Sequence, residues 1–144
     1  MLEKDVILSK ISIIKNCIKT IEKVTELNPE KLDELVVQDV FVLNLQRAIQ
    51  AAIDIANVFI SAYGWKLPDT YKESFAVLKD QKVISPDIYK VMVKMVGFRN
   101  IAVHDYQQLD VDILKSILSQ NLKNLEQFYS AVYQWLQRGN AEKS

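Results

Sequence analysis

The chain has 144 residues, 49% hydrophobic and 25% charged, a balance typical of one globular domain with a substantial core. Its 18 basic and 18 acidic residues cancel, so any contact with nucleic acid must come from a local patch. One cysteine and one histidine exclude an internal disulfide and the common zinc frameworks. No apolar run reaches the roughly 18 residues of a membrane span. Charged residues directly follow Leu2, so we expect a cytoplasmic protein without a signal peptide or membrane contact.

Only three glycines and three prolines interrupt the chain, which favours a few long helices over many short strands. The first helix is expected over residues 2–27, because isoleucines recur there with the alternating four and three spacing of a bundle seam. Asn28 and Pro29 are typical of the cap and first position of the next segment. A second helix is expected over residues 29–61, with a break near residues 36–39.

The second helix is apolar on most of its sides but carries one polar stripe with alternating spacings of three and four. The stripe consists of Arg47, Gln50, Asp54, Asn57 and Ser61. Two interpretations stay open: the stripe is simply solvated, or it forms the wall of a polar groove that holds a partner for a cation on another helix. Asp54, which lies between two isoleucines, is the candidate partner.

Turn and cap residues divide the second half of the chain. Gly64 is expected to cap the second helix, and Pro68 prevents it from continuing. A short third helix is expected over residues 69–79. The fourth helix begins at Ser85, a typical N-cap, with Pro86 at the first helical position.

The last helix is expected over residues 111–138, with Asp110 as its N-cap and Gly139 at its end. Because short connections force neighbouring helices to run antiparallel, the predicted fold is all-α: an antiparallel up-and-down bundle of four to five helices. We expect this single domain to span residues 1–139 and a frayed polar tail to follow over residues 140–144.

The candidate functional residues lie in one short stretch, residues 98–106, which reads FRNIAVHDY. It contains the only histidine, His104, which can gain and lose a proton near neutral pH. Arg99 carries a permanent charge whose planar fork suits phosphate oxygens, and the hydroxyl of Tyr106 can donate, accept or be modified. No serine or cysteine adjoins His104, so the set favours phosphoryl transfer over acyl transfer. A lone histidine at a helix end is, however, more often structural than catalytic.

The position of Arg99 strengthens the functional interpretation. An apolar line through Ile88, Met92 and Met95 continues at Arg99, which is therefore expected to face the core and to need a partner such as Asp54. On an ideal helix Arg99 and His104 point about 140° apart. They can converge only if the helix ends near His104 or if a second chain contributes to the same groove.

The pattern R-x-x-x-x-H-x-Y resembles the signature of the HepT toxins, a branch of the all-helical HEPN superfamily. The similarity extends to residues 48–57, which read AIQAAIDIAN, to residues 68–78, and to the Gly97-Phe98 lead-in before Arg99. These matches follow one another in the family's order and cover most of the chain. Asn100 supplies the polar residue that the family has after its arginine.

This resemblance implies an HEPN-like fold and the toxin role in a type II/VII-like toxin–antitoxin pair. HEPN toxins are endoribonucleases that need no metal or other cofactor and act on RNA as homodimers. Arg99, His104 and Tyr106 would then be the catalytic residues, with Asn100 and Asp54 in support. The resemblance also implies a minimal nucleotidyltransferase antitoxin that neutralises the toxin by transferring AMP to Tyr106.

Two other classes of function stay open. In one, the chain is a non-catalytic helical module that binds a nucleotide or a nucleotidyltransferase, and Arg99 and His104 only hold a phosphate. In the other, it is a dimeric scaffold in which Arg99 pairs with Asp54 for structure. A dimer is expected in any case, because the second helix looks too apolar all round to be covered by one bundle.

Overall fold

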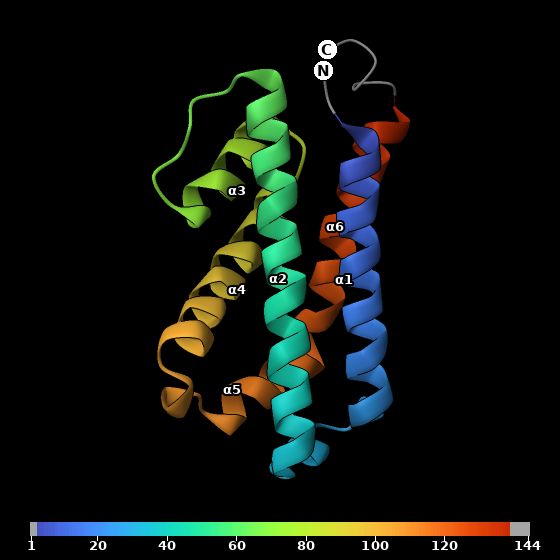
Figure 1. The fold of residues 1–144 in the computed structure, drawn as a ribbon, viewed down its shortest axis with the longest axis vertical. Helices are drawn as coiled ribbons and strands as arrows, with labels where there is room; N and C mark the ends of the chain where they lie inside the picture. Colours follow the sequence, from blue (N-terminus) through green and yellow to red (C-terminus); the bar gives the residue numbers. More distant parts are fainter. Residues whose placement is uncertain (1–2, 139–144) are drawn as a thin grey trace.

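The computed structural model describes residues 3–138, and every regular element in that part of the chain is helical. The α-helices are α1 (Lys4–Thr25), α2 (Leu35–Tyr63), α3 (Tyr71–Asp80), α4 (Pro86–His104), α5 (Val111–Ser116) and α6 (Leu122–Gln137) (Figure 1). Two short 3₁₀-helices, Pro29–Asp33 and Tyr106–Gln108, and a π-helical turn, Ile117–Asn121, connect them. The all-α prediction is confirmed.

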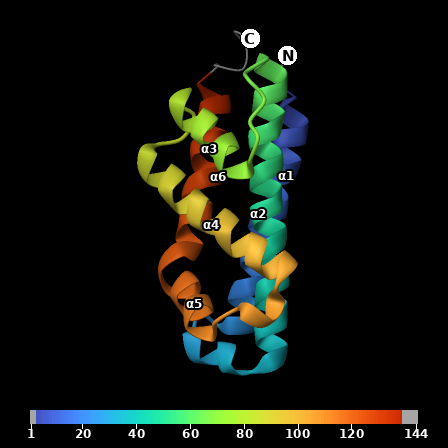
Figure 2. The ribbon, with the colours of Figure 1, turned by 90° about the vertical axis from the view of Figure 1, so that its left-hand side faces the viewer.

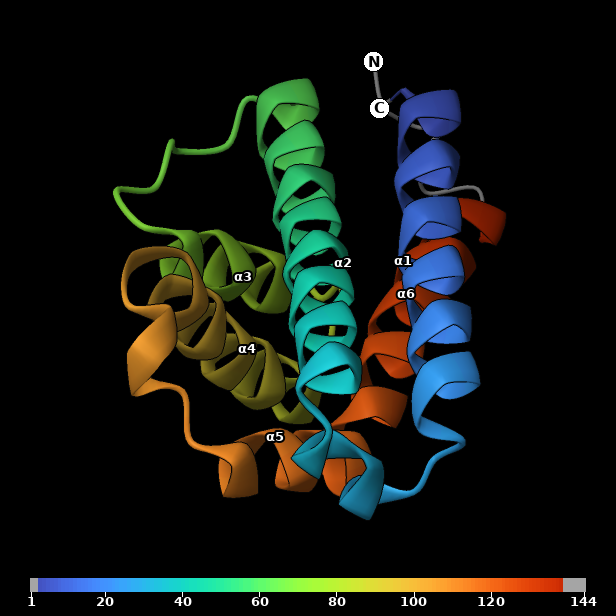
Figure 3. The same ribbon diagram turned by 60° about the horizontal axis from the view of Figure 1, so that its bottom comes forward.

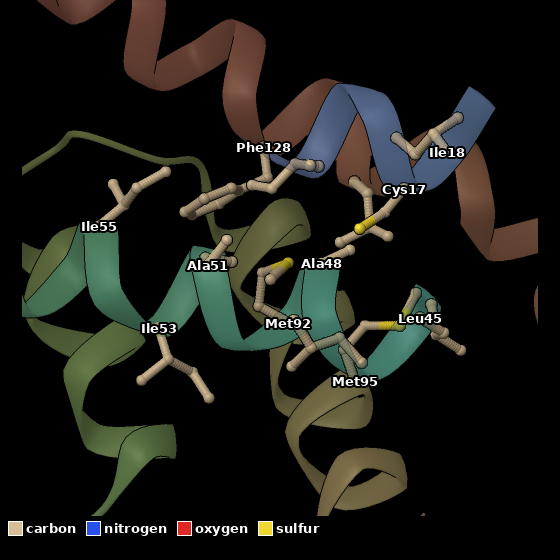
Figure 4. Close-up of a cluster of buried hydrophobic side chains, with 14 of the residues drawn as sticks. Cys17, Ile18, Leu45, Ala48, Ala51, Ile53, Ile55, Met92, Met95 and Phe128 are labelled. Carbon is tan, nitrogen blue, oxygen red and sulfur yellow. The ribbon is translucent and has the colours of Figure 1, made fainter. Parts of the chain in front are cut away.

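Helix α2 is the centre of the molecule and contacts α1, α3, α4 and α6. Helices α1 and α2 run antiparallel side by side, and α4 crosses α2 obliquely, as Figures 1 and 2 show. Around α2 the core combines Cys17 of α1, Met92 and Met95 of α4, and Phe128 of α6 (Figure 4). Since α2 is buried on most sides by its own chain, its apolar character does not by itself require a second copy.

Short polar side chains set several helix boundaries, as the sequence predicts. The carboxamide oxygen of Asn28 accepts from the Glu30 amide at 3.1 Å, and the Ser85 hydroxyl accepts from the Ile88 amide at 3.2 Å. Asp110 accepts from the Asp112 amide at 2.8 Å. These bonds satisfy amides that have no partner inside their own helix. Gly64 ends α2 with the positive φ of 66° that glycine tolerates best.

The first break in the chain lies elsewhere than predicted. Helix α1 ends at Thr25, whose hydroxyl donates to the Ile21 carbonyl at 2.7 Å and accepts from the Leu27 amide at 3.2 Å. The second helix breaks at Glu34, not over residues 36–39, because the 3₁₀-helix before it turns Leu32 fully into the core. The whole of α2, including Asp39, is therefore one continuous helix.

Two further boundaries differ from the prediction. Helix α3 takes Thr70 as its N-cap: the Thr70 hydroxyl accepts from the Glu73 amide at 3.1 Å, and the Glu73 carboxylate accepts from the Asp69 amide at 2.9 Å. The last helix is interrupted by the π-helical turn, so α5 lies across one end of the bundle before α6 rises along α1 (Figure 3). An inserted π turn adds a residue to the helix and shifts its apolar seam.

The expected single domain over residues 1–139 stays a prediction. Its first two residues, the cap at Gly139 and the tail over residues 140–144 lie outside the described part of the chain. Among the helices of residues 3–138, none combines the length and the apolar character that crossing a membrane requires.

Candidate active site

Arg99 and His104 line one open groove of about 670 Å³ in a single chain. Helix α4 contributes one wall and ends at His104, which meets the condition for the two side chains to converge. The facing residues come from the start of α3, which packs against α4. The complete lining is Asp69, Thr70, Tyr71, Arg99, Asn100, Val103 and His104. A second chain is thus not needed to bring the predicted cation and histidine to one groove.

The guanidinium of Arg99 is held from three directions. Its Nη2 donates to the Gln50 carboxamide oxygen at 2.9 Å, and its Nη1 donates to the Asn100 carboxamide oxygen at 3.2 Å. The Tyr71 ring lies 5.3 Å from the guanidinium carbon, within the range of a cation–π contact. Arg99 is half-buried rather than fully buried. Its charge is therefore positioned by neutral groups and stays available to an anion in the groove.

The predicted direct pair between Arg99 and Asp54 is wrong, because Gln50 stands between them. The Gln50 amide nitrogen donates to one Asp54 oxygen at 2.9 Å, and the Lys10 ammonium from α1 reaches the other at 3.0 Å. The Asp54 carboxylate is thus engaged by Gln50 and Lys10, and Gln50 makes the bond to Arg99 on α4. Donation to Asp54 also fixes which end of the Gln50 amide faces Arg99.

We expect Asp54→Ala to lower the free energy of unfolding by only about 1 kcal/mol, not the ~3–5 kcal/mol typical of a broken buried pair. The reason is exposure: the side chains of Lys10 and Asp54 are 31% and 32% exposed. Urea denaturation of Asp54→Ala, Lys10→Ala and the double variant measures the coupling. Fully additive effects of the two single changes would show that the observed ion pair contributes nothing.

Part of the polar stripe of α2 contacts the neighbouring helices, and part of it is solvated. Gln50 and Asp54 face α4 and α1 as described, and Asn57 accepts from the Ser74 hydroxyl of α3 at 3.3 Å. Within the stripe, Gln50 therefore holds Arg99 and Asp54 holds Gln50, while Arg47, Asn57 and Ser61 are exposed to solvent.

Tyr106 lies just beyond α4, on the polar connection where the sequence places it. The residue is 41% exposed, and its hydroxyl donates a hydrogen bond to the carboxylate of Asp39 on α2. Burial, followed by this hydrogen bond and the negative charge of Asp39, raises the pKa of Tyr106 to about 12. The hydroxyl is protonated near neutral pH at either this pKa or the ordinary value of 10.0. Tyr106 is not among the residues that line the groove.

The raised pKa of Tyr106 predicts a measurable titration. The folded pKa of Tyr106 lies near 12 and its ordinary pKa is 10.0, so the folded state binds this proton more tightly. The stability that this binding gives to the fold is lost as the pH rises from 10.0 towards 12. Asp39→Asn removes the charge and should lower the Tyr106 pKa towards 10.0. Ultraviolet titration, with Tyr106→Phe as the reference, isolates this hydroxyl; superimposable curves for wild type and Asp39→Asn would contradict the assignment.

The sequence did not reveal several residues that shape this site. Lys10, Tyr71 and Asp39 carried no local signal, because each acts across helices far apart along the chain. Gln50 lay in the polar stripe, but the charge of Asp54 made the carboxylate look like the better partner for Arg99.

Residues 14–132 match the Ribonuclease HepT-like family. The chain belongs to this family. It is also 38% identical over 128 residues to the mRNA nuclease HepT of Shewanella oneidensis, covering 89% of this chain and 96% of that protein. These matches confirm the resemblance to HepT toxins. They also confirm the prediction that the chain is an enzyme of the ribonuclease class.

Solved structures agree with this HepT-like assignment. A tri-AMPylated Shewanella oneidensis HEPN toxin in complex with MNT antitoxin superimposes with a TM-score of 0.86, at 37% identity, over 92% of this chain and 99% of that one. YutE, a cytosolic protein of unknown function from Bacillus subtilis, gives a TM-score of 0.83 over 95% of this chain and 92% of its own. At 15% identity YutE shows the fold alone. The HEPN-like helical fold is confirmed.

Proposed function

We propose that this HepT-like chain is the toxin of a type II/VII-like toxin–antitoxin pair and that it cleaves RNA without a metal ion. One observation carries the proposal: Arg99 and His104 line the same open groove, and within residues 3–138 the side chains that accept from the Arg99 guanidinium are the neutral amides of Gln50 and Asn100. An arginine and a histidine on one groove supply the positive charge and the proton-exchanging group that phosphodiester cleavage requires.

The chemistry follows from the substrate. RNA carries its own nucleophile, the 2′-hydroxyl, so the protein needs to move protons and stabilise charge on the phosphorus oxygens. In this proposal His104 exchanges the proton, and Arg99 binds the non-bridging oxygens as negative charge builds up on them. Asn100 and the Gln50–Asp54 pair hold the guanidinium in place. Tyr106 is proposed as the third catalytic residue; it lies two residues beyond His104 and outside the lining of the groove.

Purified protein incubated with RNA, with and without a chelator, tests this function. Cleavage that continues in the chelator supports the proposal. The alternative, a non-catalytic module for a nucleotide or a nucleotidyltransferase, predicts binding of nucleotide or RNA with no cleavage in either condition. Cleavage that requires added metal would contradict both.

We also propose a minimal nucleotidyltransferase antitoxin as the partner and Tyr106 as the AMP acceptor. The related Shewanella toxin, which is tri-AMPylated and bound to an MNT antitoxin, supports this regulation. In this chain Tyr106 is exposed on a connection between helices, where a partner protein can reach its hydroxyl.

We propose a homodimer as part of the same function. The apolar sides of α2 are covered by its own chain, so the proposed dimer contact consists of exposed apolar residues near the end of α4 and on α5. Ile101, Val103 and Ile113 are 44%, 46% and 50% exposed. Ile101 and Ile113 also line an apolar pocket of about 330 Å³ between α4 and α5. We expect light scattering to give about twice the chain mass of 16.6 kDa and Ile101→Lys to reduce it to one chain. A wild-type monomer at micromolar concentration would contradict the dimer.

A further inference from the structure

The hydroxyl of Tyr106 already has a proton acceptor within the toxin. Asp39 lies 67 positions earlier in the chain, near the start of α2, and its carboxylate oxygen accepts the hydrogen bond that the hydroxyl donates. Both side chains are exposed, so a partner protein can approach them together. Neither residue lines the groove that holds Arg99 and His104.

Transfer of AMP to a tyrosine requires that its proton leave. A tyrosine hydroxyl is protonated near neutral pH at its ordinary pKa of 10.0, and the pKa of Tyr106 is raised further, so a base must take the proton as the oxygen attacks. A general base must lie within hydrogen-bond reach of the proton that it removes. Among the carboxylates of residues 3–138, that of Asp39 is the one hydrogen-bonded to this hydroxyl.

We propose that Asp39 is the general base for adenylylation of Tyr106, so that the toxin supplies a catalytic residue for its own neutralisation. This inference rests on the proposed function, in which a nucleotidyltransferase modifies Tyr106. The partner then needs to supply the bound nucleoside triphosphate and its orientation, while the acceptor hydroxyl arrives with its base already in place.

The phenolic oxygen of Tyr106 forms a bond to the α-phosphorus of ATP, and the bond from that phosphorus to the oxygen bridging to the β-phosphate breaks. Pyrophosphate leaves with the electron pair of the broken bond. The phenolic proton passes to the Asp39 carboxylate, which later releases it to solvent.

Asp39→Asn separates base catalysis from simple positioning. Asparagine keeps an oxygen that can accept the Tyr106 hydrogen bond, but it cannot take up the proton. Asp39→Ala removes both properties, and Asp39→Glu restores a carboxylate on a longer side chain. Asp105→Asn is the matched control, because it removes an exposed negative charge one residue from Tyr106.

The experiment measures the rate of the first AMP transfer by intact-mass spectrometry, using purified toxin, its nucleotidyltransferase partner and ATP. We expect Asp39→Asn to lower kcat for transfer by ~10²–10⁴-fold with little change in KM for the toxin. Asp39→Glu should regain part of the rate, Asp105→Asn should match wild type, and circular dichroism should be the same for all four variants.

Two results would overturn the inference, and they are distinguishable. Transfer to Asp39→Asn at the wild-type rate, with Asp39→Ala slower, would mean that Asp39 only positions the ring; AMP on Tyr106 of wild type would then still support the proposed function. Absence of AMP from Tyr106 in the wild-type toxin would overturn the proposed modification and this inference together.

Discussion

Replacing His104 with alanine is expected to abolish RNA cleavage and toxicity while leaving the helical content unchanged. General acid–base catalysis contributes ~10²–10⁴-fold to such reactions, and the chain has no second histidine to take over. The side chain is exposed at the last position of α4, so its removal leaves no cavity in the core.

Cleavage of a labelled RNA and circular dichroism, measured on the same preparation, check this expectation. Arg99→Lys is a useful second variant. It keeps the positive charge but loses the planar guanidinium, which donates to Gln50 and to Asn100 at the same time. A folded His104→Ala protein that cleaves at the wild-type rate would remove His104 from the mechanism.

Tyr106→Phe is expected to escape neutralisation by the antitoxin. The change deletes the proposed AMP acceptor and its hydrogen bond to Asp39 but keeps the ring. An AMP group on Tyr106 would add a bulky anion two residues beyond His104. This anion would compete with RNA phosphate for Arg99 by both volume and charge. The toxicity of Tyr106→Phe tests a separate point: if the variant is no longer toxic, the hydroxyl also has a catalytic role.

Intact-mass spectrometry after co-expression with the antitoxin, followed by peptide mapping, measures the modification. The wild type should carry one or more AMP groups on Tyr106, and Tyr106→Phe should carry none. Tyr71→Phe and Tyr89→Phe serve as controls that keep the acceptor. AMP mapped to Tyr71 or Tyr89 in the wild type would overturn the assignment, and absence of AMP would favour inhibition by binding alone.

Local chemistry predicts much of this fold. Asn28, Ser85 and Asp110 act as N-caps as expected, because capping depends on a side chain and an amide only two or three residues apart. The break at Glu34 and the π-helical turn before α6 could not be predicted in this way. Both depend on how one helix packs against others, which no short pattern encodes.

The same distinction applies to the site. The spacing of Arg99, His104 and Tyr106 on and just beyond one helix could be read directly from the sequence. The partner of Arg99 could not, since Asp54 is engaged by Gln50 and by Lys10 of a third helix, and Gln50 is the residue that bonds Arg99. The bond between Tyr106 and Asp39 joins residues 67 positions apart and left no trace in the pattern.

We propose that the groove of Arg99 and His104 cleaves RNA through the RNA's own 2′-hydroxyl. The most direct test compares an RNA that the protein cuts at one mapped position with the same RNA carrying a single 2′-deoxy nucleotide on the 5′ side of that bond, both in chelator. We predict that the unmodified strand yields a 5′-hydroxyl and a 2′,3′-cyclic phosphate or its hydrolysed form, and that the substituted bond stays intact. Cleavage of the substituted bond, or products with a 5′-phosphate, would contradict this mechanism.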